Sequence, residues 1–163
     1  MTLFKGRKIN TMKNSMINVM NNDVTDQHIM PAGKYYVGDP CYVISNENWI
    51  PFLENVGYFG THTKADNGDI VVNWYEGLFS YNFRTCFAHN TAWGDGIYQL
   101  VEDHKIINEI WVDAGVISIM PFDAIDDKER AFACGAVYEF DKPFNVQFVD
   151  GRFIIGNLKI ETS

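Results

Sequence analysis

The 163-residue chain is long enough for one domain with a sizeable hydrophobic core. Hydrophobic residues make up 47% and aromatic residues 15% of it, a composition that is typical of a globular chain and excludes a disordered one. No apolar run approaches the roughly 20 residues that a membrane-spanning helix needs, so we expect no membrane-spanning segment.

The formal charge of −8 is unevenly distributed along the chain. Four basic residues and no acidic residue fall within residues 1–20, so all 21 acidic residues lie in the remaining chain. An acidic body repels phosphate groups, and we therefore expect no nucleic acid to bind to it. The acidity keeps the protein soluble, or it forms a decoy surface for a basic partner.

The chain contains three cysteines, Cys41, Cys86 and Cys134. An odd and sparse set of cysteines indicates a reducing compartment, and the basic residues near the start are followed by no apolar signal-peptide region. We therefore expect a cytoplasmic protein.

Residues 1–29 are rich in Asn, Met and Thr and lack alternating hydrophobicity, which predicts a flexible basic tail before a single β-rich domain over 30–163. Gly33–Ile44 then reads as two short strands joined at a tight corner by Gly38 and Pro40. Residues 47–56 form the only expected helix, with Ser45 as its N-cap, Pro51 in its first turn and Gly57 just beyond its end.

From Tyr58 onward the pattern favours strands. They include a hairpin of 61–64 and 70–76 around the turn at 66–69, one continuous strand over 78–89 and another over 132–140. Turn signals recur every 8–12 residues, and the Asp150-Gly151 pair is typical of a two-residue hairpin turn. Helices between successive strands, which a parallel α/β fold needs, are missing. We therefore predict a mainly β fold, an antiparallel sandwich or partly open barrel, with one short helix near residues 47–56. Exposed strands in such a fold favour self-pairing, so a homodimer is a reasonable state.

Three motifs occur in order: Tyr-Tyr-Val-Gly-Asp-Pro-Cys-Tyr-Val-Ile at 35–44, Gly-Asp-Gly-Ile-Tyr at 94–98 and Val-Asp-Ala-Gly-Val-Ile-Ser-Ile-Met-Pro at 112–121. As a set they resemble a group of small uncharacterised proteins from tailed bacteriophages and bacteria. The resemblance covers residues 33–121. It implies a phage or bacterial origin and no established activity, and a phage-encoded protein would be located in the host cytoplasm.

A thiol enzyme is one candidate chemistry, with Cys41 as nucleophile, His89 as base and Asp95 or Asp113 orienting it. A nucleophilic thiolate needs an imidazole or a helix N-terminus to lower its pKa. Cys41 leads into an expected strand, where a small cysteine is ordinary packing.

The turn carboxylates Asp39, Asp95 and Asp113, with His89, form a second candidate. If their turns meet at one end of the fold, they could activate water or hold a divalent cation. Asp also satisfies backbone donors in turns, which is its commonest role there. Because no recognised metal-ligand spacing occurs, we predict no metal site, and the sequence identifies no cofactor.

Aromatic residues near the turns form a third candidate, a shallow ligand-binding mouth. Tyr42, Trp93 and Tyr98, with Asp95 beside them, could hold a planar ligand. We therefore expect a non-enzymatic binding protein that acts on a host protein or on a small, nucleotide-like signalling molecule. The alternatives are a small hydrolase that uses the turn carboxylates and His89, and an acidic decoy.

Overall fold

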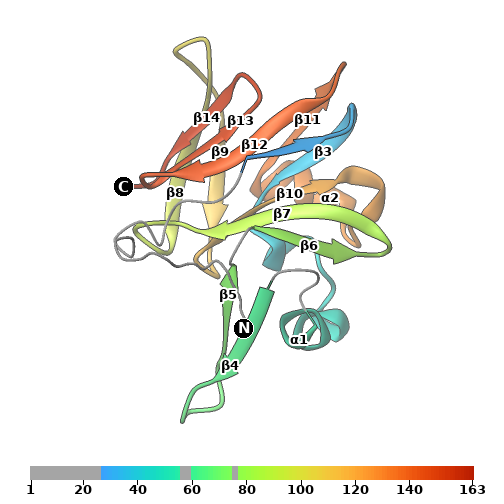
Figure 1. The fold of residues 1–163 in the computed structure, drawn as a ribbon, viewed down its shortest axis with the longest axis vertical. Helices are drawn as coiled ribbons and strands as arrows, with labels where there is room; N and C mark the ends of the chain where they lie inside the picture. The colour runs from blue at the N-terminus through green and yellow to red at the C-terminus, as the bar shows by residue number, and fades with distance from the viewer. Residues whose placement is uncertain (1–26, 56–59, 75–76) are drawn as a thin grey trace.

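A computed structural model describes residues 27–55, 60–74 and 77–163. In these residues the chain is mainly β, with antiparallel sheets, two α-helices and no closed barrel, which confirms the predicted fold class. Figure 1 shows two large sheets, with the helices and a projecting hairpin on one side of them. The predicted tail lies outside the described residues except for 27–29.

Five strands form one sheet and six form the other. The five-stranded sheet has the order β11 (Ala136–Phe140), β3 (Gly33–Gly38), β10 (Val116–Pro121), β7 (Arg84–Asn90) and β6 (Leu78–Tyr81). The six-stranded sheet has the order β2 (His28–Met30), β12 (Phe144–Val149), β13 (Arg152–Ile155), β14 (Leu158–Glu161), β8 (Gly96–Glu102) and β9 (Lys105–Val112). β4 (Gly60–Lys64) and β5 (Ile70–Trp74) pair as a separate hairpin, as predicted.

The main core lies between the two large sheets. β12 and β14 alternate buried and more exposed residues, so each presents one apolar face to the facing sheet. Aromatic rings fill much of this core: Phe140 stacks on Phe144 with ring centroids 3.7 Å apart, and Tyr35 meets Phe144 edge-on at 5.0 Å. This packing makes the two sheets a sandwich.

A second core lies on the outer face of the five-stranded sheet. There α1 (Asn46–Glu54) and α2 (Lys128–Cys134) cover the sheet through Phe52 and Ala131. All six residues of β10 are buried because apolar side chains cover both of its faces. The fold is therefore a sandwich with a third, partly helical layer.

The helices show where the sequence reading was right and where it was wrong. α1 lies where the helix was predicted and follows Ser45, but Pro51 sits in its interior rather than in its first turn. The part of the predicted strand that spans 132–134 belongs instead to α2, whose N-cap Asp127 accepts a hydrogen bond from the Arg130 N–H. No described helix is long and apolar enough to cross a membrane.

Two turns also differ from the sequence reading. The corner after β3 continues into the 3-10 helix η2 (Pro40–Tyr42) rather than a second strand. The expected strand over 78–89 is divided at Asn82 and Phe83, which turn the chain from β6 into β7.

Candidate functional site

Asp39 is the best-connected of the predicted site residues. It is fully buried, and its Oδ1 accepts the Cys41 N–H at 2.8 Å. Its Oδ2 accepts the N–H groups of Asp113 at 2.8 Å and Ala114 at 2.6 Å. Burial raises the pKa of Asp39, and these three N–H donors oppose that rise. The carboxyl group therefore joins the end of β3 to the turn between β9 and β10.

The surroundings of Cys41 keep its thiol protonated. Burial raises the pKa of Cys41, and the neighbouring charge of Asp39 raises it further. A reactive cysteine needs the opposite shift, toward the thiolate at neutral pH. The environment of Cys41 thus fits a structural thiol.

His89 faces the main core, away from the outer layer. Its ring stacks on Phe148 at a centroid distance of 4.0 Å, and its Nδ1 lies 2.9 Å from the carbonyl oxygen of Asn90. Cys41 lies in η2, and the next residues along the chain, Val43 and Ile44, are buried in the second core on the outer face of the five-stranded sheet. Cys41 and His89 therefore belong to opposite faces of the five-stranded sheet.

The loop between β7 and β8 is held by hydrogen bonds of its own. Thr91 Oγ1 donates to the Gly94 carbonyl at 2.6 Å and accepts the Gly94 N–H at 2.8 Å, and the Tyr98 hydroxyl donates to the same carbonyl at 2.8 Å. Asp95 Oδ1 lies near Gly115, so this loop adjoins the β9–β10 turn. Trp93, in the same loop, is exposed.

The predicted turns thus lie close together, and the side chains of Asp39, Thr91 and Tyr98 bind backbone groups there. Tyr42, another predicted ligand residue, lies elsewhere, in the outer layer, where the Arg130 guanidinium lies 5.3 Å from its ring centroid. Across the described ranges, no group of three His, Cys, Asp or Glu side chains could hold a metal ion.

The β6–β7 turn carries a residue that sequence reasoning did not select. Asn82 and Phe83 both have positive φ, 49° and 63°, between the paired residues Tyr81 and Arg84. A bulky side chain is rarely found in this left-handed region because its Cβ crowds the backbone. The Phe83 side chain is nevertheless 102% exposed relative to the reference residue. Its ring therefore gains nothing from burial in the fold.

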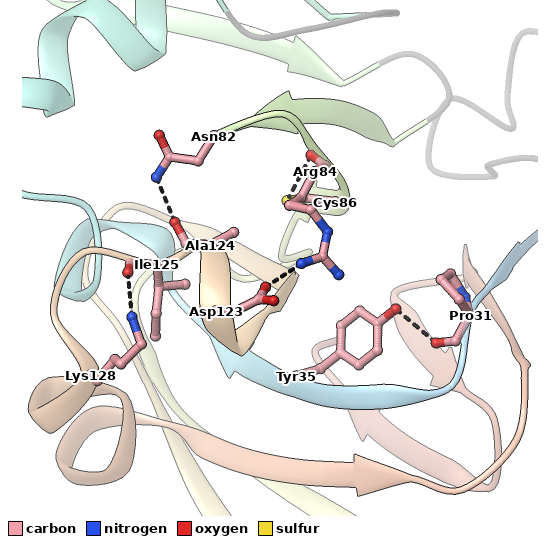
Figure 2. Close-up of polar contacts among 9 residues, drawn as sticks. All are labelled: Pro31, Tyr35, Asn82, Arg84, Cys86, Asp123, Ala124, Ile125 and Lys128. Atoms are coloured by element: carbon pink, nitrogen blue, oxygen red, sulfur yellow. Dashed lines mark hydrogen bonds and ion pairs between the residues drawn. The ribbon is translucent and has the colours of Figure 1, made fainter.

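Three side chains of the same turn fasten it to the segment that follows β10. The Asn82 amide donates to the Ala124 carbonyl at 2.7 Å, and Arg84 forms an ion pair with Asp123. The Tyr81 hydroxyl donates to Asp126 at 2.5 Å. Figure 2 shows Asn82 and Arg84 both directed toward this segment, which includes the 3-10 helix η3 (Phe122–Ala124). We call residues 81–84, held in this way, the Phe83 tip.

Two other hairpins provide a comparison for the Phe83 tip. Asp103 and His104 turn β8 into β9 with φ of 51° and 63°, and Asp150 and Gly151 turn β12 into β13 with φ of 52° and 76°. In all three turns the second residue has the larger positive φ, and this second position favours glycine. Only the last turn has glycine there.

The sequence pattern does not predict a turn at the Phe83 tip. Phe79, Tyr81 and Phe83 alternate as a continuous strand would, and Asn82 is the only residue there with a turn preference. Comparison of the chain with family models, with curated proteins and with solved structures found no match. The case for function therefore rests on the chain's own geometry.

Proposed function

We propose that the protein is a non-enzymatic binding protein that holds a partner protein, with Phe83 as the anchor of the contact. One observation carries this proposal: a fully exposed phenylalanine is kept at a φ of 63° on a turn that three side chains fasten in place.

The energetics of this turn favour a role outside the fold. The left-handed conformation costs a non-glycine residue about 1–2 kcal/mol. An exposed ring returns none of this cost through burial, and strained residues are concentrated at binding and active sites. Aromatic anchors contribute much of the binding energy of protein interfaces. A partner that buries the ring would account for both the strain and the exposure.

The hydrogen bonds and the ion pair of the turn preorganise Phe83 for binding. Because Tyr81, Asn82 and Arg84 are already held by Asp126, Ala124 and Asp123, little further ordering is needed on binding. The complementary surface on the partner is an apolar pocket that admits a phenyl ring, with a carboxylate at its rim to meet Arg84. The resemblance to tailed-phage proteins makes a bacterial host protein the first class of partner to test.

The residues first considered for catalysis support this proposal. Asp39 already accepts three backbone hydrogen bonds, and the pKa of Cys41 is raised. Both residues are explained by roles within the fold.

Site-specific photo-cross-linking tests the proposal. The photoreactive residue p-benzoylphenylalanine replaces Phe83 in one full-length sample and His104 in a control sample, because both residues are the second of a two-residue turn and have a φ of 63°. In bacterial lysate we expect a discrete cross-linked product from position 83 only. Excess unmodified protein should suppress it, whereas excess Phe83→Gly protein should not. Equal products from both positions, or no competition by the unmodified protein, would overturn the proposal.

A further inference from the structure

A hollow lies at the end of the five-stranded sheet where β3 begins and β10 ends. Its volume is about 430 Å³, within the range of small-molecule sites. β3, the start of β7 and η3 all contribute to its lining, which consists of Ala32, Gly33, Lys34, Tyr35, Arg84, Phe122 and Asp123.

The positively charged side chains of the hollow have N–H groups that are free to bind an anion. Lys34 Nζ lies 5.2 Å from the centroid of the Phe122 ring. Within the described ranges, no carboxylate lies at ion-pair distance from Lys34, although the exposed Glu139 is its cross-strand neighbour on β11. An ammonium group without a bound carboxylate is free to meet an incoming oxyanion.

Arg84 provides further donors on the same wall. One of its terminal nitrogens binds Asp123, and a guanidinium has five N–H donors in total. Figure 2 shows the other terminal nitrogen pointing away from Asp123, toward the side where Tyr35 and Pro31 lie. The Tyr35 hydroxyl donates its proton to the Pro31 carbonyl at 2.8 Å, so it is not free to donate to an incoming oxyanion.

Phe122 adds a flat apolar surface next to these donors. Its ring is partly buried against the outer core and meets Phe132 at a centroid distance of 5.6 Å. Lys128 Nζ lies 5.7 Å from the same ring centroid, so a second positive charge is close by. With Lys34 and Arg84 in its lining against Asp123 alone, the hollow favours an anion even though the chain carries a net charge of −8. Lys128 lies outside that lining, and its Nζ donates to the Ile125 carbonyl at 3.1 Å.

We propose that this hollow binds a small molecule in which an oxyanion, phosphate or carboxylate, is joined to a planar ring. The oxyanion lies between the Lys34 ammonium and the unused Arg84 donors, and the ring packs on Phe122. The hollow shares Arg84 with the Phe83 tip, but it opens on Lys34 and Phe122 rather than on Phe83, and the inference does not depend on the proposed partner protein.

Isothermal titration of the full-length protein with four probes tests the site: phenyl phosphate, benzoate, inorganic phosphate and benzyl alcohol. The variant is Lys34→Met, which removes the charge and keeps the apolar stem, and the control is Lys64→Met on the β4–β5 hairpin. Arg84 is left unchanged because it also fastens the Phe83 tip.

We expect saturable binding of phenyl phosphate, of benzoate or of both. The binding should be at least 10-fold tighter than that of inorganic phosphate and of benzyl alcohol, since each lacks half of the recognised group. Lys34→Met should weaken it at least 10-fold and Lys64→Met should not. The stronger of the two ring compounds identifies the oxyanion. Absence of saturable binding, equal binding of inorganic phosphate, or equal effects of the two variants would overturn the inference.

Discussion

Phe83 and His104 occupy equivalent positions in two hairpins, each the second residue of a two-residue turn with a φ of 63°. The two residues have the same φ, yet Phe83 carries a large apolar ring and His104 a polar one. Replacing each residue separates what the turn contributes to stability from what the side chain contributes to binding.

Phe83→Gly and His104→Gly should each leave the free energy of unfolding unchanged or raise it by up to about 1 kcal/mol, because glycine relieves the left-handed strain at some cost in chain entropy. Urea denaturation measures this change. A loss of stability confined to Phe83→Gly would show that the ring stabilises the fold and would count against its role as an anchor.

Asn82→Gly keeps the positive φ accessible but removes the hydrogen bond to the Ala124 carbonyl. We expect a loss of about 1–2 kcal/mol in unfolding free energy, because the carbonyl loses its partner. Hydrogen exchange should rise in the turn while the core strands stay protected. Asp103→Gly is the control in the other hairpin. Unchanged exchange in residues 81–84 would mean that this hydrogen bond does not fasten the tip.

Asp39→Asn should destabilise the protein by about 2–4 kcal/mol, because an amide NH₂ group would face at least one of the three backbone N–H donors that the carboxylate accepts. Asp113→Asn is the control, because Asp113 contacts Asp39 through its backbone N–H and not through its side chain. Its free energy of unfolding should stay within about 0.5 kcal/mol of the wild-type value. Thermal and urea unfolding measure both variants. Full stability of Asp39→Asn would refute the structural role and reopen the hydrolase alternative.

Acid should loosen the Phe83 tip through Asp126. Partial burial raises its pKa, but hydrogen bonds from Tyr81, Ser45 and Asn48 outweigh this and lower it below the ordinary 3.8. A carboxyl with a lowered folded pKa stabilises the fold above its unfolded pKa, and this stabilisation disappears as the pH falls from about 4 through the folded pKa.

The measurement is unfolding free energy as a function of pH for wild type and Asp126→Asn, with Asp66→Asn in the exposed β4–β5 turn as control. The stability difference between wild type and Asp126→Asn should shrink below pH 4, whereas Asp66→Asn should parallel wild type. A difference that is constant with pH would show that ionised Asp126 does not hold the tip.

Cys41 should react slowly with iodoacetamide at neutral pH, because its raised pKa keeps the thiol protonated. Mass spectrometry of the native and the urea-unfolded protein gives the two rates, and we expect the native rate to be at least 10-fold lower. Cys86, buried and with its pKa raised to about 12, serves as an internal reference. Rapid native labelling of Cys41 alone would favour the thiol enzyme.

The sandwich could be predicted because period-2 alternation and the Asp150-Gly151 turn are local signals, and β12 and β13 pair around that turn as expected. α2 could not, because the short run from Phe132 to Cys134 fits either a strand or a helix until its packing is known. The sequence left open whether the turns of Asp39 and Asp113 meet, and the contact between them depends on the pairing of β3 with β10.

The candidate site was harder to predict than the fold. Phe83 continues the alternation of a strand, so its pattern gives no indication of a turn. Lys34, Arg84 and Phe122 lie far apart in the sequence and meet only through the order of β3, β10 and β7 in the sheet. Such a site depends on long-range pairing, which no local pattern specifies.

The affinity of the cross-linked partner for wild type and for Phe83→Gly tests the central claim most directly. With the stability of both proteins measured in parallel, we predict that Phe83→Gly binds at least 30-fold more weakly, the loss expected of an interface anchor worth about 2 kcal/mol or more, while remaining at least as stable as wild type. Equal affinity of the two proteins for that partner would contradict the claim that Phe83 is the anchor.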